Sequence, residues 1–294
     1  MIEWGCTFVR RSDGRASEDL AEVYSWCTDP EREKCSGFFA RYPRGKGIGD
    51  LTPFAGIASG PGPVRPVPAA GNGGIGECLL RTLGRPHEAH VAVSGGIDCW
   101  LLAAMLLRAG VRVHAWTLRT GIAGYCEYDQ ARRMGRALGV PVECTDASYR
   151  DFPDALPDFT AAVQFPVYNL HPVSKLLLAR AFIKQGITEV ITGDGADQVA
   201  RHDQECDLLP LTLSAFRSQG VRVNAPFLDP AVQACFPTRD PDKSRVRALA
   251  LALGVPAVPK RSTMFPDVPG CLEHSFRLLE AHLEARTLCA ESRA

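Results

Sequence analysis

The stretch His90-Val91-Ala92-Val93-Ser94-Gly95-Gly96-Ile97-Asp98 decides the fold. Its first four residues form a short apolar run that is typical of a buried strand, and the pattern from Asp98 to Arg108 predicts an apolar helix that ends at Gly110. The two glycines between strand and helix allow a tight turn whose N–H groups face an anion, and the helix dipole adds to that attraction. The order predicts a phosphate-binding loop; a plain turn is the alternative.

Strand and helix alternate through the middle of the chain. Further strands are expected over residues 111–118, 140–144 and 189–192, and further helices over residues 77–83, 128–138 and 173–184. The last third is mainly helical, with helices expected over residues 208–218, 230–236, 243–253 and 271–288. This alternation predicts an α/β fold in which a parallel sheet carries helices on both faces, followed by extra C-terminal helices.

A second loop repeats the design of the first. The expected strand 189–192 runs into Gly193-Asp194-Gly195-Ala196-Asp197, so small residues and carboxylates again stand at the carboxyl end of a strand. Ligands bind at that end of the strands in open α/β sheets. Because carboxylates do not bind phosphate directly, the expected task of Asp98 is to hold a magnesium ion that bridges phosphate oxygens. Asp197 acting only as a helix cap is the alternative.

The first 75 residues differ from the rest, being rich in Gly, Pro, Arg and Ser. The proline-rich segment 59–68 is expected to be a linker or an extended edge segment, and residues 18–26 are expected to form one short helix with Ser17 as its N-cap. Residues 71–76 formally fit GxGxxG, but no strand precedes them, so a linker hinge is the better interpretation. We therefore expect an N-terminal extension over residues 1–75 and a main domain over residues 76–294.

Composition narrows the class of protein. Lys+Arg 33 and Asp+Glu 33 give a formal net charge of +0, which argues against nucleic-acid and membrane-surface partners. The eleven cysteines are scattered without a CxxC pair or a zinc-type spacing, so we expect reduced, mostly buried thiols. The sequence has no signal-peptide pattern and no apolar run of about 20 residues, which favours a cytoplasmic location.

Several motifs resemble a known family. Ser94–Asp98 resembles the SGGxDS motif of the PP-loop ATP pyrophosphatases, and residues 192–198 resemble the SG(E/D)G(A/S/G)DE loop of the asparagine synthetase family. The PFLD segment at 226–229, the helix from Lys243 to Leu249 and the FPDVPG stretch at 265–270 are similar to later motifs of the same family. The resemblance covers about residues 76–275.

The resemblance implies a five-stranded sheet of the PP-loop, adenine nucleotide alpha-hydrolase-like type. It also implies an enzyme that uses ATP and Mg²⁺ to adenylate a carboxylate and then forms an amide bond. Asparagine synthetases, β-lactam synthetases and lasso-peptide cyclases share this domain and differ in their nitrogen nucleophile. The implied partners are a small-molecule or peptide carboxylate substrate and either a separate ammonia-supplying subunit or an amine on a substrate, in specialised biosynthesis.

The same resemblance assigns roles to individual residues. Binding of ATP or pyrophosphate is implied for Ser94, Gly95, Gly96, Asp98, Cys99, Gly193 and Lys243. Asp98 and Asp197 are implied as magnesium ligands, and Asp194 and Lys260 as catalytic residues. Contact with the substrate is expected for Glu127 and Tyr168, although Glu127 starting the helix at residue 128 is an equal alternative.

The sequence departs from the family in four places. Position 2 is Ile2, not the catalytic cysteine of a glutaminase, and the segment before Gly76 is too short for that domain; a truncated remnant of it is one interpretation. Cys99-Trp100 stand where small hydroxyl residues are common, and we interpret Cys99 as a tolerated substitution, with a nucleophile as the alternative. Ser262 occupies the usual place of the closing-loop lysine, two positions after Lys260, and Gln198 replaces a glutamate.

Two other interpretations stay open at this point. A PP-loop tRNA-modifying or sulfur-transfer enzyme shares the first motif, but such proteins often carry paired cysteines or a basic face, which this sequence lacks. A degenerate, non-catalytic subunit of an amidotransferase complex would explain Cys99-Trp100 and the shifted lysine.

Overall fold

The computed structural model describes residues 6–42, 51–61, 74–201, 208–257 and 265–292. Its centre is a five-stranded sheet with the order β6-β5-β4-β7-β8, in which every neighbouring pair is parallel. The strands are β4 (Glu88–Ala92), β5 (Arg112–Arg119), β6 (Val142–Asp146), β7 (Glu189–Thr192) and β8 (Arg222–Asn224). The predicted α/β fold with a parallel five-stranded sheet is confirmed.

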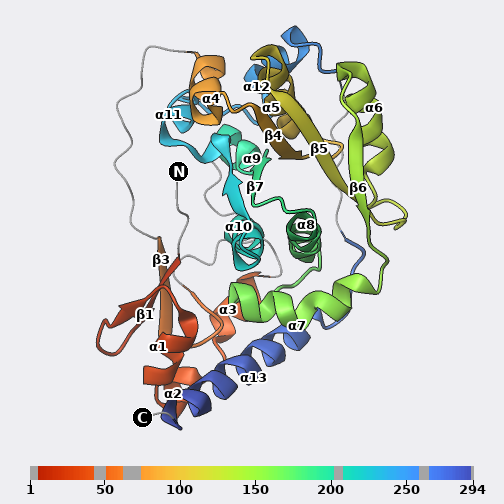
Figure 1. Ribbon diagram of the computed structural model, residues 1–294. Coiled ribbons are helices and arrows are strands. Elements are labelled where there is room, and N and C mark those ends of the chain that lie inside the picture. The colour runs from red at the N-terminus through yellow and green to blue at the C-terminus, as the bar shows by residue number, and fades with distance from the viewer. Residues whose placement is uncertain (1–5, 43–50, 62–73, 202–207, 258–264, 293–294) are drawn as a thin grey trace.

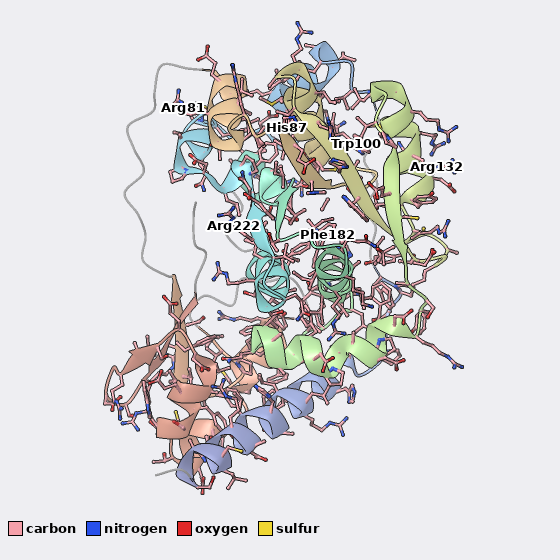
Figure 2. The ribbon with its side chains drawn as sticks, in the orientation of Figure 1. Arg81, His87, Trp100, Arg132, Phe182 and Arg222 are labelled. Atoms are coloured by element: carbon pink, nitrogen blue, oxygen red, sulfur yellow. The ribbon has the colours of Figure 1, made fainter. Side chains whose placement is uncertain are left out.

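Helices cover both faces of this sheet (Figure 1). One core cluster joins Val91 and Val113 of the sheet to α4 (Ile75–Leu83), α5 (Ile97–Arg108), α6 (Tyr128–Leu138) and α12 (Ser244–Ala252). Another joins Trp116 and Val190 to α8 (Val173–Lys184) and α10 (Leu208–Ser218). Trp100 on α5 and Phe182 on α8 are fully buried in these two clusters, on opposite sides of the sheet (Figure 2).

The strand order brings the two predicted loops together. From β4 the chain moves outward to β5 and β6, then returns past β4 to β7 and β8, so the order reverses at β4. Ala92 pairs with Thr192 in the parallel register of β4 and β7, and each of these residues is the last of its strand. The loops that follow them therefore leave the sheet side by side, at the switch point where α/β sheets bind ligands.

The N-terminal residues form a second small sheet (Figure 1). It has the order β2-β1-β3, with β1 (Cys6–Arg10), β2 (Ala16–Ser17) and β3 (Ile57–Pro61). Between β2 and β3 the chain forms three short helices, α1 (Leu20–Trp26), α2 (Asp29–Arg32) and α3 (Ser36–Arg41). Its core cluster, which includes Phe8, Leu20 and Ile57, is completed by Phe276 and Leu279 of the long helix α13 (Cys271–Glu291). The first and last segments of the chain therefore share one core.

Some sequence predictions need correction. Ser17 is not the N-cap of α1: Asp19 accepts the N–H of Ala21, while the Ser17 hydroxyl accepts the N–H of Asp19, because the chain is still leaving β2 at Ser17. The expected helix 230–236 is the single-turn α11 (Pro230–Gln233). Residues 59–61 of the proline-rich segment belong to β3, as an extended edge, and the rest of that segment lies outside the described residues.

Other elements were not anticipated. The helix α7 (Asp151–Val163) contains Pro157 in its interior, and prolines normally argue against a helix. The 3-10 turn η2 (Pro226–Leu228) was not expected either, whereas α9 (Ala196–Arg201) begins where a helix was expected to follow the second loop. In the described part of the chain, nine cysteines are free thiols and no helix is long and apolar enough to cross a membrane.

Candidate active site

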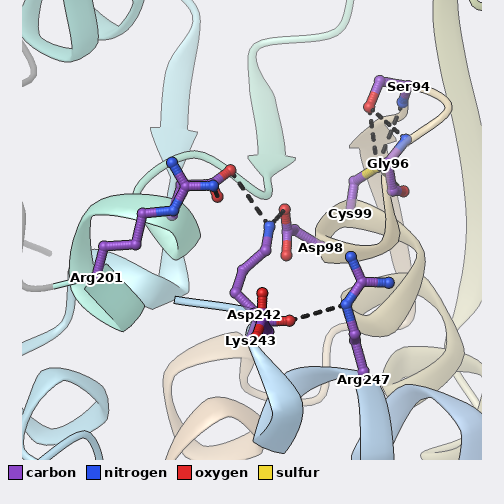
Figure 3. Close-up of polar contacts among 9 residues, drawn as sticks. Ser94, Gly96, Asp98, Cys99, Arg201, Asp242, Lys243 and Arg247 are labelled. Atoms are coloured by element: carbon purple, nitrogen blue, oxygen red, sulfur yellow. Dashed lines mark hydrogen bonds and ion pairs between the residues drawn. The ribbon is translucent and has the colours of Figure 1, made fainter. Parts of the chain in front are cut away.

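The loop after β4 is held in place by the first turn of α5. The Ser94 hydroxyl accepts the N–H of Gly96 at 3.1 Å, and the Cys99 sulfur accepts the N–H of Ser94 at 3.3 Å (Figure 3). On the other side, the indole N–H of Trp100 donates to the Ser94 carbonyl at 2.9 Å. The two residues that depart from the family pattern therefore fix both backbone groups of Ser94, so the loop is pre-formed.

Cys99 is a structural thiol. It is 5% exposed, and burial raises its pKa to about 11, which the hydrogen bonds from Ser94 only partly oppose. A thiol with this pKa carries almost no thiolate at neutral pH, and the thiolate is the nucleophile. The interpretation of Cys99 as a tolerated substitution therefore agrees with its surroundings, whereas a nucleophilic role does not.

The loop after β7 depends on two glycines that pack closely against other elements. A Cβ atom on Gly193 would lie 2.7 Å from the backbone nitrogen of Cys99 and 3.0 Å from Cβ of Asp98. Gly195 has φ +91°, and a Cβ atom there would lie 2.2 Å from Leu228 in η2. Because neither position has room for a side chain, the loop lies directly against the start of α5 and η2 supports it from behind.

The two loops meet at Lys243 (Figure 3). Its Nζ lies 2.6 Å from Oδ2 of Asp98 and 3.3 Å from Oδ2 of Asp197, and the residue is only 4% exposed. Arg201, one turn after Asp197 on α9, pairs with its other oxygen at 3.1 Å. Burial raises the pKa of Asp98, and the Lys243 ammonium opposes this. The lysine therefore holds together two carboxylates that come from different strands.

This lysine has an unusual backbone. Lys243 adopts φ +53°, in the left-handed region, directly before α12 begins at Ser244. That conformation is uncommon for a residue with a long side chain and carries a conformational cost. The two ion pairs of the side chain offset this cost. The contacts of the site therefore decide the conformation at position 243, against the local preference of the backbone.

The carboxylates fit the expected magnesium ion. Among the described residues, Oδ1 of Asp98 is buried without a hydrogen-bond partner, and both Asp98 and Asp197 direct oxygens to one point of positive charge. No group of three or more His, Cys, Asp or Glu in that part of the chain could hold a metal alone. Mg²⁺ usually takes one or two carboxylates, with phosphate oxygens and water completing the shell, so this pair suits a magnesium ion that arrives with a nucleotide.

A cavity of about 790 Å³ opens at the carboxyl ends of the strands. The residues predicted from the sequence that line it are Ser94, Gly95, Gly96, Asp98, Cys99, Glu127, Gly193, Asp194, Asp197 and Lys243. Glu127 precedes α6 but its side chain does not cap that helix; a Cβ on Gly95 would lie 3.0 Å from its carboxylate. Tyr168 is not part of this lining, because its ring packs edge-on against Tyr42 in an aromatic cluster. Lys260 lies outside the described residues.

The cavity residues that the sequence reasoning missed include Tyr125, His171 and Lys175. The Tyr125 hydroxyl and His171 Nδ1 are 3.1 Å apart, and Lys175 Nζ lies 3.6 Å from Oδ1 of Asp194. Burial, assisted by the positive charge of Lys175, lowers the pKa of His171 to about 4. One sequence feature could have pointed to Lys175 as a site residue. A cation in the first turn of a helix opposes the helix dipole, so its presence there suggests a role other than helix stability.

Replacement of Trp100 by phenylalanine tests whether α5 pre-forms the loop. Trp100→Phe removes one buried hydrogen bond and leaves the Ser94 carbonyl unpaired, so we expect a loss of about 1–2 kcal/mol in the free energy of unfolding. ATP affinity measured by calorimetry should fall as well. In the control Trp116→Phe, which removes the bond to His90 elsewhere in the sheet, stability should fall without a change in ATP affinity. Equal ATP affinity in both variants would contradict this.

Thiol reactivity tests the state of Cys99. Cys126 is exposed and lines the same cavity. Burial tends to raise the pKa of its thiol, but hydrogen bonds from the backbone of Tyr128, Thr120 and Gly121 lower this pKa overall. We expect iodoacetamide at pH 7.5 to modify Cys126 in the native protein and to spare Cys99, as read by peptide mass spectrometry. Labelling of Cys99 at the rate of Cys126 would show that its thiol is neither buried nor protonated.

The neutral His171 predicts a pH dependence of stability. Its pKa lies near 4 in the folded chain and near 6.5 when unfolded, so between these values the unfolded chain binds more protons. Stability is therefore complete above pH 6.5 and is lost as the pH falls toward 4. The His171 contribution should decrease by about 2 kcal/mol between pH 7.5 and pH 5. Urea unfolding of wild type and His171→Gln at both values measures it; equal pH slopes would contradict the assignment.

Part of this chain is similar to a known protein family. The asparagine synthase family model matches residues 87–202. Among solved structures, one similar chain is the U34-tRNA thiolase NcsA from Methanococcus maripaludis with its 4Fe-4S cluster, at 17% sequence identity and a TM-score of 0.42, covering 71% of this chain and 78% of that chain. A likeness this weak supports no conclusion about function. No curated protein matches the sequence.

The matched range contains β4, β5, β6 and β7 and both carboxylate loops. It therefore includes Asp98, Asp194 and Asp197, whereas Lys243 joins the site from a segment outside the match. Asparagine synthases use ATP, which agrees with a glycine-rich loop at a helix N-terminus beside two carboxylates. The part of the chain that is similar to the asparagine synthase family is therefore the part that carries both carboxylate loops.

Proposed function

We propose that this protein is an ATP- and Mg²⁺-dependent ligase that adenylates a carboxylate and joins it to ammonia or an amine as an amide. The observation that carries the proposal is the convergence of Asp98 and Asp197 on Lys243, beside the pre-formed glycine loop and over a cavity of about 790 Å³. That volume falls within the range of about 300–1,000 Å³ that is typical of small-molecule sites. Specialised biosynthesis remains the proposed setting.

In this proposal the nucleotide lies with its terminal phosphates on the loop that follows β4. The backbone N–H of Gly95, the Ser94 hydroxyl and the start of α5 supply hydrogen bonds and positive dipole to these phosphates. Asp98 and Asp197 would hold Mg²⁺, which supplies positive charge against the phosphate oxygens. Lys243 and Arg247, both of which line the cavity, offset the remaining negative charge.

The chemistry then takes two steps. An oxygen of the substrate carboxylate attacks the α-phosphorus, and the bond to the bridging oxygen breaks with loss of pyrophosphate. The nitrogen lone pair next attacks the acyl carbon; the bond to the AMP oxygen breaks, AMP leaves with the electron pair, and the nitrogen gives up one proton. The pre-formed loop and the fixed carboxylates need little rearrangement during these steps, and this is how electrostatic stabilisation becomes effective.

Pyrophosphate exchange tests the proposal. Incorporation of labelled pyrophosphate into ATP is measured with Mg²⁺ and a panel of carboxylic acids, including amino acids and short peptides. Asp98→Asn and Asp197→Asn should each lower the exchange at least about 100-fold, because each removes a ligand of the ion that neutralises the phosphates. Asp158→Asn, a surface carboxylate paired with Arg180 at 2.5 Å, is the matched control and should leave the exchange unchanged.

The outcome separates the rival interpretations. Unchanged exchange in both site variants would reject the assignment of the site. Absence of exchange together with absence of ATP binding by calorimetry would favour a non-catalytic subunit.

A sulfur-transfer enzyme is the second candidate, and one observation favours it. Cys126 is an exposed thiol that lines the nucleotide cavity, and its pKa is lowered. An adenylating enzyme with a reactive thiol in its cavity has the parts to carry a persulfide to an activated substrate. Loss of sulfur transfer to tRNA in Cys126→Ser, with tRNA co-purifying with the wild type, would support this candidate over the amide ligase.

A further inference from the structure

Two cysteines on different elements meet outside the nucleotide cavity. Cys78 is on α4 and Cys235 follows α11 by two residues, and their sulfur atoms lie 3.4 Å apart. Neither residue lines the cavity. The two cysteines are 157 residues apart in the sequence, so their spacing gave no sign of the pair. The fold therefore brings together two thiols that the proposed function does not use.

The packing around the pair keeps the two sulfur atoms close. Cys78 is 2% exposed and belongs to the core cluster that α4, α5 and α12 form with the sheet, and Cys235 packs against the same cluster. The Cys235 sulfur also lies 3.3 Å from the carbonyl oxygen of Ala231, one turn earlier. Arg245 of α12 donates to the Cys235 carbonyl at 2.8 Å. Because both the backbone and the sulfur of Cys235 have fixed contacts, the pair is part of the folded core.

The two thiols differ in their access to solvent. Cys78 is buried, whereas Cys235 is partly exposed. A small oxidant that arrives from solvent therefore reaches Cys235 first, and the oxidised sulfur has Cys78 as its neighbour. A sulfenic acid that forms beside a second thiol condenses with it to a disulfide.

The surroundings of Cys235 also make the pair slow to react. Burial and the contact with Cys78 raise the pKa of the Cys235 thiol to about 11, and the charges of Arg245 and Arg81 only partly oppose this. The thiolate is the reactive form, so at neutral pH most of the pair stays as thiols. Oxidation at this site therefore needs a sustained supply of oxidant.

We propose that Cys78 and Cys235 form an oxidation site, at which hydrogen peroxide converts the two thiols into a disulfide that ties α4 to α11. In the first step the Cys235 sulfur attacks one peroxide oxygen, the O–O bond breaks, and Cys235 becomes a sulfenic acid as water leaves. The Cys78 sulfur then attacks the sulfenic sulfur, the S–O bond breaks, and a second water takes up the Cys78 proton. The two thiols lose two electrons, and one peroxide is reduced to two molecules of water.

The disulfide braces the elements that support the active site. The helices α4 and α11 lie side by side, and both contact η2 (Figure 1). Leu228 of η2 lies directly behind Gly195 in the loop after β7. A bond between α4 and α11 therefore restrains η2 and, through it, that loop. It also removes conformational freedom from the unfolded chain, because the two cysteines are far apart in the sequence.

Peptide mass spectrometry after oxidation tests the site. The full chain is treated with hydrogen peroxide, the remaining thiols are blocked with iodoacetamide, and the chain is digested without reduction. We expect a cross-linked pair of peptides that contain Cys78 and Cys235, and dithiothreitol should release them. The Tm of the oxidised protein should rise by at least about 3 °C. Hydrogen exchange of the backbone in residues 193–197 should become slower.

Matched variants separate this site from the other thiols. Cys235→Ser removes the accessible thiol at a partly exposed position and should give neither the cross-link nor the rise in Tm. Cys289→Ser, which changes an exposed cysteine on α13, should behave as the wild type does. Absence of the cross-link in the native wild type, its formation only in urea, or an unchanged Tm after cross-linking would each overturn the inference. None of these measurements uses ATP, so failure of the proposed ligase function would appear separately, as absent pyrophosphate exchange.

Discussion

The site depends on one buried cation between two carboxylates. Lys243 pairs with Asp98 after β4 and with Asp197 after β7, and without it two negative groups would face each other in a partly buried place. Breaking such a pair by removing one partner is costly, because the remaining charges are left uncompensated. The lysine adopts a left-handed backbone at this position, so α12 is attached to the sheet loops through the residue directly before it. This attachment sets the positions of Asp98 and Asp197 at the carboxyl ends of the strands.

Close backbone packing sets the distances around this charge centre. Gly193 lies against the backbone of Cys99, and Gly195 lies against Leu228, so the loop after β7 has one available path. On the opposite side Trp100 and Cys99 hold both backbone groups of Ser94. At these two positions, where the sequence departs from the resemblance, a thiol and an indole hold the loop from within the core. The departures at 99 and 100 thus preserve the loop and do not argue for a degenerate site.

The cavity then combines two subsites of different character. Lys243 lies 2.6 Å from Oδ2 of Asp98, whereas Lys175 lies 3.6 Å from Oδ1 of Asp194, so the first pair is tight and the second is loose. Both use carboxylates from the same short loop, three residues apart.

The sequence by itself determined the α/β class, the helices and strands around the glycine loops, and the carboxylates Asp98, Asp194 and Asp197, because these depend on local patterns of period, turn and motif. It missed α7, where prolines hid the helix, and β8, which is three residues long. It assigned the N-cap of α1 to Ser17, since the end of β2 could not be foreseen.

Only the tertiary structure decided which charges meet. Lys175 and Asp194 are 19 residues apart in the sequence, and Lys243 and Asp98 are 145 apart, so no local pattern shows that either pair meets. The sequence also did not show that the ring of Tyr168 packs against Tyr42 in an aromatic cluster, or that burial lowers the pKa of His171. Motifs specify the groups that a loop presents, but packing between distant elements decides their partners, their exposure and their charge.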